Sequence, residues 1–205
     1  AGRRGGRKGS WMSEALFALG GAIGVALSLL LVLTLVRPGL HIWPPPGPGT
    51  WQSYVFWILF RSLNVLCFAV AALTPSGFLG LPLAVRGLAG LLLAASLAAF
   101  VYAFKVLGRD NSYGASEGLV TSGVYGWTRN PQNAMLIVVY ASLAIAADSG
   151  PVYLLAGTMM AVYALMVLLE EPWLEAHYGE AYRSYCRSVP RFFHWRRAWR
   201  SLARP

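Results

Sequence analysis

The sequence predicts an all-α integral membrane protein, a bundle of about five transmembrane helices with a long polar loop and a helical C-terminal tail. Hydrophobic residues make up 57% of the 205 residues and charged residues only 12%, whereas about a quarter of a typical soluble domain is charged. Apolar runs follow one another along the chain, and basic residues flank them. This apolar surface exceeds what one small soluble core can bury, so lipid is the expected solvent.

Five apolar runs are long enough, or nearly long enough, to cross a membrane, for which a helix needs roughly 20 apolar residues. The first run ends before Arg37, the second at Thr74 and the last at Glu170. Only residues 148–151 separate the last two runs, which predicts a tight helical hairpin. The predicted spans are residues 15–36, 54–73, 83–107, 133–147 and 152–169, and the fourth of them is short.

Residues 13–205 are expected to form a single domain. Residues 1–12 are rich in glycine and basic residues and Met12 resembles a natural start, so a disordered tail or a cloning remnant is expected there. The first apolar run is too long for a signal peptide and lacks a small-residue cleavage site. Cys67 and Cys186 have neither a nearby partner nor metal-ligand spacing, so both are expected to stay reduced.

The basic residues predict both a partner and an orientation. The formal net charge is +9, but the basic residues flank apolar runs, which argues against nucleic acid and for membrane lipids as the partner. An N-terminus outside and a C-terminus in the cytoplasm place the basic residues of the 105–130 region and the tail inside, as the positive-inside rule requires. The outer loops 75–82 and 148–151 contain no Lys or Arg, and only the basic residues 3–8 oppose this orientation.

Three polar segments then share the cytoplasmic face: the loop 108–130, the acidic end of the last span and the tail 173–205. Glycines in the loop let backbone amides approach a ligand, and Asn130-Pro131 predicts a helix start whose first amides can bind an anion. The adjacent carboxylates of Glu170 and Glu171 stay ionised only beside cations or water. Two interpretations remain open: a plain helix boundary, or a site for a cationic ligand whose negative group meets Arg129.

Some polar and aromatic residues within or near the spans are candidates for either a functional or a structural role. Arg61 and Asn64 share one face of the second span and indicate either function or a structural link between helices. The histidines show no ligand spacing, so no metal site is expected. Most of the aromatic residues near span ends are expected to form an interfacial belt; they are Trp11, Trp43, Trp51, Tyr54, Trp57 and Trp173.

Two sequence blocks are specific enough to indicate a family. The loop contains LVTSGVY at residues 119–125, followed by Trp127, Arg129 and Pro131. After the paired glutamates come YGEAYRSY at 178–185 and VPR at 189–191. Together these blocks resemble the isoprenylcysteine carboxyl methyltransferases, whose superfamily includes phospholipid and thiol methyltransferases and, more distantly, sterol reductases. The resemblance covers residues 100–193, which makes this the expected catalytic half.

The resemblance implies an S-adenosylmethionine-dependent membrane methyltransferase that acts on a lipophilic acceptor. Glu170 or Glu171 suits the ammonium of that cofactor, Arg129 and helix-start amides suit its carboxylate, and the ring of Tyr125 suits the sulfonium. The expected cofactor-binding residues are Glu117, Gly118, Leu119, Val120, Tyr125, Asn130, Pro131, Gln132, Asn133 and Glu170. The expected catalytic residues are Arg129 and Glu171, and the expected substrate-binding residues are Met166 and Arg61.

Two positions depart from the family pattern. Asn130 replaces a histidine but still offers a hydrogen-bond donor and an acceptor. Met166 stands where the carboxyl methyltransferases carry an arginine that meets the acceptor's carboxylate. Because methionine cannot neutralise a carboxylate, an amine, thiol or hydroxyl acceptor is expected instead. A neutral acceptor can need a base, for which Glu171 and Tyr125 are candidates.

Two alternative functions stay open at this point. One is an NADPH-dependent membrane oxidoreductase related to the sterol reductases, although the LVTSGVY and VPR blocks favour the methyltransferases. The other is a non-catalytic membrane protein that retains the fold, which the replacement at Met166 keeps open. Titration with both cofactors separates the three functions.

Overall fold

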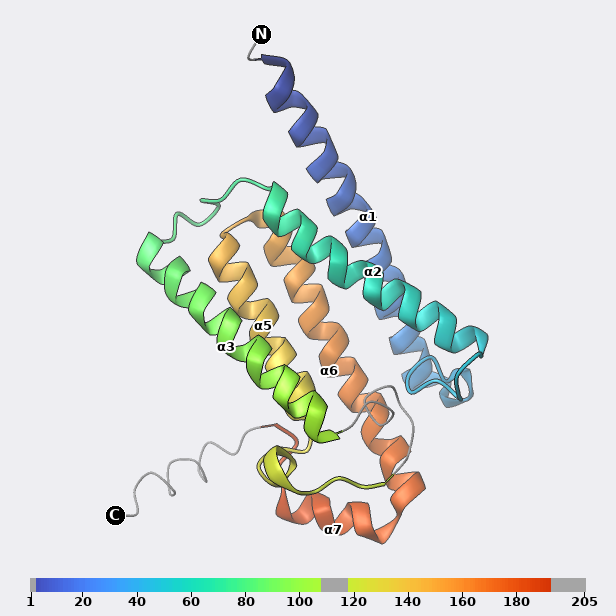
Figure 1. Cartoon of the computed structure of the whole chain (residues 1–205). Coiled ribbons are helices and arrows are strands. Elements are labelled where there is room, and N and C mark those ends of the chain that lie inside the picture. The colour runs from blue at the N-terminus through green and yellow to red at the C-terminus, as the bar shows by residue number, and fades with distance from the viewer. Residues whose placement is uncertain (1–2, 108–117, 193–205) are drawn as a thin grey trace, which may run out of the picture.

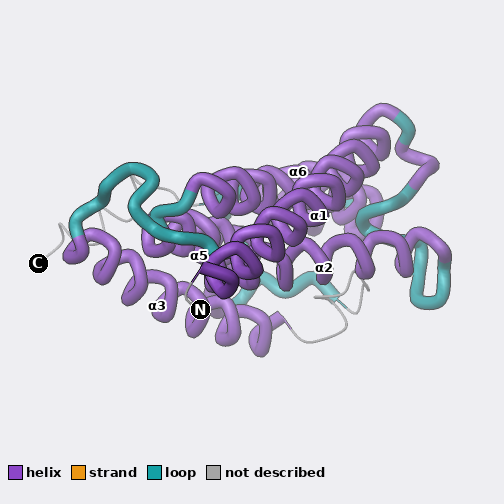
Figure 2. The backbone as a smooth tube through the Cα atoms, turned by 90° about the horizontal axis from the view of Figure 1, so that it is seen from above, coloured by secondary structure: helices purple, strands orange, loops and turns teal. Residues whose placement is uncertain are grey.

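The computed structural model describes residues 3–107 and 118–192, and Figures 1 and 2 show this part of the chain as helices joined by loops. It contains no strand, which confirms the predicted all-α class. The elements in chain order are α1 (Arg3–Val36), η1 (Pro38–Leu40), α2 (Trp51–Leu73), α3 (Leu83–Leu107), η2 (Gly123–Gly126), α5 (Pro131–Ala147), α6 (Gly150–Tyr178) and α7 (Glu180–Ser188).

Four of the described helices, α1, α2, α3 and α6, are long and apolar enough to cross a membrane. The remaining predicted span, the fourth, is α5, an apolar helix of 17 residues. At 1.5 Å per residue α5 is about 25 Å long, slightly less than the roughly 30 Å of a hydrocarbon core. The chain is therefore an integral membrane helical bundle, as predicted. The expectation for residues 1–12 stays a prediction.

Several helix boundaries differ from the predicted ones: α1 begins at Arg3, α5 at Pro131 and α6 at Gly150, and two further differences have a local cause. Thr50 caps α2, because its hydroxyl oxygen accepts a hydrogen bond from the amide of Ser53 at 3.3 Å, and the helix therefore begins at Trp51. The last span does not end at the glutamates, since α6 continues through Pro172 to Tyr178. A proline removes one backbone hydrogen bond, but its φ angle is compatible with a helix. The paired glutamates thus lie inside α6.

The helices pack in two connected groups around a common core. Helix α1 contacts α2 and α6, while α5 lies between α3 and α6. The buried apolar residues of α1, α2, α5 and α6 form one cluster that includes Leu27, Phe56, Leu63, Val139 and Met159. Helices α2 and α3, by contrast, make hardly any contact within the described chain.

Asp148 joins the α2–α3 loop to the α5–α6 hairpin, and these two connections lie at the end of the bundle away from α7 (Figure 1). Its carboxylate accepts hydrogen bonds from the amides of Leu79 and Leu81, each at 3.0 Å. Its backbone oxygen accepts from the amides of Gly77 and Phe78 at 2.8 and 2.9 Å. The tight α5–α6 hairpin is thus present, and it anchors the α2–α3 loop.

The expected aromatic belt is only partly present. Trp11, Trp51 and Tyr54 are each more than half exposed, as an interfacial position requires. Trp43 is instead 4% exposed, and its ring lies 4.6 Å from that of Phe56. Its interpretation as a belt residue was therefore wrong, because the loop after α1 folds back under the bundle and buries the indole.

Candidate active site

A cavity of about 440 Å³ opens among α2, α3, α5, α6 and the segment after residue 117, within the roughly 300–1,000 Å³ typical of small-molecule sites. We call its two regions the polar end and the membrane part. The polar end is lined by Trp43, Gly118, Leu119, Val120, Tyr125, Arg129, Asn130, Gln132, Asn133, Glu170, Trp173, Leu174, Tyr178, Tyr182 and Tyr185. The membrane part is lined by Trp57, Phe60, Arg61, Asn64, Phe68, Leu97, Phe100, Phe104, Leu107, Leu136, Val139, Tyr140, Tyr163 and Met166.

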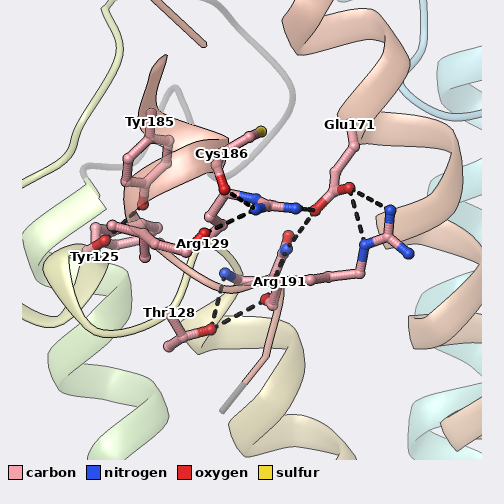
Figure 3. Close-up of polar contacts among 9 residues, drawn as sticks. Tyr125, Thr128, Arg129, Glu171, Tyr185, Cys186 and Arg191 are labelled. Atoms are coloured by element: carbon pink, nitrogen blue, oxygen red, sulfur yellow. Dashed lines mark hydrogen bonds and ion pairs between the residues drawn. The ribbon is translucent and has the colours of Figure 1, made fainter. Parts of the chain in front are cut away.

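The segment before α5 is held against α7 at the polar end. The hydroxyl of Tyr185 donates a hydrogen bond to the backbone oxygen of Tyr125 at 2.6 Å (Figure 3). Gly123 begins η2 with a φ of 59°, a conformation that favours glycine at this turn. Burial, and then the charge of Glu170, raises the pKa of Tyr125. This hydroxyl therefore stays protonated at neutral pH, which argues against Tyr125 as a general base.

Glu171 lies at the centre of an ionic cluster, the Glu171 cluster, formed with the largely buried Arg129 and Asn130 and with half-exposed Arg191 (Figure 3). Oε1 of Glu171 accepts from Arg129 at 2.9 Å and from the amide of Asn130 at 3.2 Å. Oε2 lies 2.7 Å from the guanidinium of Arg191. The cluster joins three segments: the residues at the start of α5, α6 at Glu171, and the segment after α7 that contains Arg191.

Most N–H groups of the Arg129 guanidinium already donate to acceptors within the protein, which leaves few of them for a ligand. Besides Glu171, its guanidinium donates to the backbone oxygens of Cys186 and Val189 at 3.2 and 2.7 Å. Its Nε also donates to Glu171 at 3.3 Å, so most of the five N–H groups of a guanidinium are engaged. The side chain is only 10% exposed. This arrangement favours positioning of the surrounding segments over direct capture of a ligand.

Glu170 differs from its neighbour although the two are adjacent in α6. It lines the cavity, and within the described chain it forms no ion pair with Lys or Arg. The indole N–H of Trp43 is buried on the same cavity wall and interacts with the side chain of Glu170, although among the described residues it has no hydrogen bond of good geometry. A carboxylate that faces a cavity without a cationic partner is a natural site for a cationic ligand.

The first turn of α5 forms the opposite wall of the polar end. Pro131 occupies the first helical position, where its missing N–H costs no hydrogen bond. Gln132 and Asn133 follow it and line the cavity. Amides of a first helical turn favour anions, because they lack helical acceptors and carry the positive end of the helix dipole.

Residues 84–181 match the family model for phospholipid methyltransferase. This part of the chain belongs to the phospholipid methyltransferase family. No curated protein and no solved structure matches the chain. The matched residues of this methyltransferase family member include α3, η2, α5 and α6, which together form most of the cavity wall. The predicted family is confirmed, and methyltransferase activity follows from it.

The cavity of this family member brings together most of the residues predicted for its site. Glu117 lies outside the described residues. Pro131 is buried in α5, and Glu171 binds the cluster instead of lining the cavity. The predicted residues that line the cavity are Arg61, Gly118, Leu119, Val120, Tyr125, Arg129, Asn130, Gln132, Asn133, Met166 and Glu170. Their individual roles stay predictions.

The lining residues that were not assigned to a site from the sequence include two tryptophans and two buried tyrosines. Trp43 and Trp173 were grouped with the belt, although a tryptophan directly before the stiff 44–49 segment is a sign of a fixed position. Tyr140 and Tyr163 line the cavity as well. In the sequence they lie within apolar runs, where a tyrosine is easily counted as one more large apolar residue. A buried tyrosine hydroxyl needs a hydrogen-bond partner. Two tyrosines within apolar spans therefore already indicated polar contacts inside the bundle.

Proposed function

We propose that the chain is a methyltransferase that uses S-adenosylmethionine and acts on a lipophilic acceptor taken from the bilayer. The observation that carries the proposal is Glu170, a carboxylate that lines the cavity and has no basic partner in the described chain. One continuous cavity joins this carboxylate to the apolar membrane part. A charged small molecule and a lipid-soluble one can therefore meet inside it.

The residues of the polar end fit the charged groups of S-adenosylmethionine. Glu170 suits the ammonium, and the first-turn amides of Gln132 and Asn133 suit the carboxylate. The rings of Tyr125 and Trp173 suit the sulfonium by cation–π attraction. When bound, the cofactor would supply an activated methyl group: the acceptor's nucleophile would form a bond to that carbon as its bond to sulfur breaks, the sulfonium would become a neutral thioether, and the proton of an O–H, S–H or N–H acceptor would pass to solvent.

The protein's own contribution is to hold and enclose the reactants. The Glu171 cluster ties α5, α6 and the segment after α7 together, so the walls of the polar end keep their spacing. We therefore propose that Arg129 and Glu171 are positioning residues and do not touch the reacting atoms. Tyr182 and Tyr185 of α7 close the polar end and limit access of water.

The membrane part supplies the acceptor site in this proposal. Helices α2 and α3 hardly contact each other, and Phe68, Phe100 and Phe104 line the cavity where these helices face it. This weakly packed side is the proposed entry for an apolar molecule. Arg61 lies on the same wall, 5.1 Å from the ring centre of Trp57, and we propose that it contacts an electronegative group of the acceptor together with Met166.

The test is calorimetric titration of the purified full chain in detergent with S-adenosylmethionine. The wild-type protein is expected to bind it. Glu170→Gln is expected to weaken binding by about 30-fold or more, because removing one partner of an enclosed charge pair costs about 2–5 kcal/mol. The matched control is Glu175→Gln, whose carboxylate is half exposed and pairs with Arg183 at 3.5 Å outside the cavity.

Three outcomes of the titration distinguish the alternatives. Binding that Glu170→Gln abolishes and Glu175→Gln preserves supports the proposal. Saturation with NADPH and indifference to S-adenosylmethionine would identify an oxidoreductase instead. Failure of a folded protein to bind either cofactor would overturn the proposed activity and leave a non-catalytic membrane protein of this family.

A further inference from the structure

A polar group of three residues interrupts the apolar wall of the membrane part. Asn64, Tyr140 and Tyr163 all line the cavity and come from α2, α5 and α6. Each lies near the middle of its helix. The two tyrosines are 1% and 2% exposed. Polar groups at this depth of a membrane protein are costly and usually face a functional cavity. We call these residues the polar trio.

The hydrogen bonds within the polar trio determine what it offers to a ligand. The side-chain nitrogen of Asn64 donates to the backbone oxygen of Phe60 at 2.7 Å, which fixes the orientation of the amide. Its Oδ1 therefore faces the tyrosines, and both hydroxyls donate to it, that of Tyr163 at 3.4 Å. The two tyrosine side chains also interact with each other. Because their protons are engaged within the polar trio, what the hydroxyl oxygens can still offer to a ligand is an acceptor lone pair.

The surroundings of the polar trio make these lone pairs selective. Neighbouring wall residues, among them Phe60, Phe68 and Val139, are apolar, and Arg61 lies one helical turn from Asn64. A molecule whose O–H or N–H enters this region can donate a hydrogen bond to one of these oxygens. An analogue in which that hydrogen is replaced, such as a methyl ether, leaves the buried oxygens without a donor. Sites of this kind reject the analogue that lacks the hydrogen bond more strongly than they reject small changes in apolar size.

The position along α6 separates this region from the proposed cofactor site. Tyr163 precedes Glu170 by seven residues, which is about 10 Å along a helix that rises 1.5 Å per residue. A molecule held by the polar trio thus lies beyond the polar end, near the middle of the bundle. The headgroup of a bilayer phospholipid stays in the interfacial layer outside the hydrocarbon core, so a more compact amphiphile fits this depth.

We propose that the polar trio binds the O–H or N–H group of the acceptor and selects for it, so that the substrate class is a compact lipophilic alcohol, phenol or amine. This inference rests on the proposed methyltransferase function. The cavity offers an apolar enclosure for the body of such a molecule and two oriented acceptors for its polar group.

The test compares alcohols with their own methyl ethers, which differ only in the donor proton. The probes are 1-dodecanol, farnesol and 4-dodecylphenol, each paired with its ether, and the readout is the shift in thermal unfolding of the full chain in detergent. At least one alcohol is expected to bind about tenfold more tightly than its ether, the scale of one buried hydrogen bond. The double variant Tyr140→Phe, Tyr163→Phe is expected to bind both alike.

Tyr153→Phe is the matched control, because the hydroxyl of Tyr153 contacts Asp148 at 3.3 Å at the far end of the bundle. It is expected to retain the preference for the alcohol. Equal binding of every alcohol and ether by the wild-type protein, or an unchanged preference in the double variant, would overturn the inference. Titration of each sample with S-adenosylmethionine separates this result from a failure of the proposed function and shows that the variant is folded.

Discussion

At the residue scale, Glu170 and Glu171 show how neighbours in one helix acquire different roles. Successive residues of an α-helix point about 100° apart, so one carboxylate faces the cavity and the other faces the start of α5. Glu171 is neutralised by Arg129 and Arg191, at 2.9 and 2.7 Å, while Glu170 has no basic partner in the described chain. The sequence left the pair open to two interpretations, a helix boundary or a ligand site, and the resemblance assigned Glu170 to the cofactor; the structure adds that of the two only Glu170 lines the cavity.

Removal of the Glu171 charge tests the positioning role. Glu171→Gln is expected to lower the unfolding temperature in detergent, because breaking a buried ion pair from one side costs about 3–5 kcal/mol. Glu175→Gln is the control, since its ion pair with Arg183 is half exposed and such pairs contribute about 0–1 kcal/mol. Equal unfolding temperatures for the two variants would contradict a structural role for the cluster.

At the element scale, α6 carries most of the architecture. Its inward face presents Tyr163, Met166 and Glu170 to one cavity, at spacings of three and four residues that return to the same side of a helix. It also packs against α1, α2 and α5. Where two helices approach closely in a membrane, small residues allow the contact.

Gly24 marks the close contact between α1 and α6. A Cβ atom placed there would lie 2.8 Å from the methyl group of Thr158. Gly24→Leu is therefore expected to destabilise the bundle by about 1–3 kcal/mol, the scale of overpacking, measured as a lower unfolding temperature. Gly21→Leu is the control, because nothing lies within 4 Å of its Cβ position. A Gly24 variant as stable as the Gly21 variant would show that α1 does not pack as described.

At the scale of the whole molecule, the bundle has two distinct ends. The α2–α3 loop and the α5–α6 hairpin meet at one end through Asp148, and η2 and α7 lie at the other (Figure 1). The polar end of the cavity lies beside α7. The 75–82 and 148–151 loops contain no Lys or Arg, so the positive-inside rule predicts that this first end lies outside the cell.

Labelling with a membrane-impermeant maleimide tests this orientation. The parent protein carries Cys67→Ser and Cys186→Ser, and single cysteines replace Ser76 or Ser184, which are both exposed and lie at opposite ends. In intact cells the Ser76→Cys protein is expected to react, and the Ser184→Cys protein only after permeabilisation. The reverse pattern would place the candidate site on the outer face.

The sequence by itself determined the class of the protein, the approximate extents of its apolar helices and its family. These properties depend on composition, on runs of about 20 apolar residues and on two short motifs, all of which are local along the chain. It did not determine that α6 continues past Pro172, that Trp43 turns inward or that Asn64 joins Tyr140 and Tyr163. Tertiary packing decided those points, because each depends on which residues from distant segments become neighbours. The same packing gave Glu171 its arginine partners and left Glu170 facing the cavity.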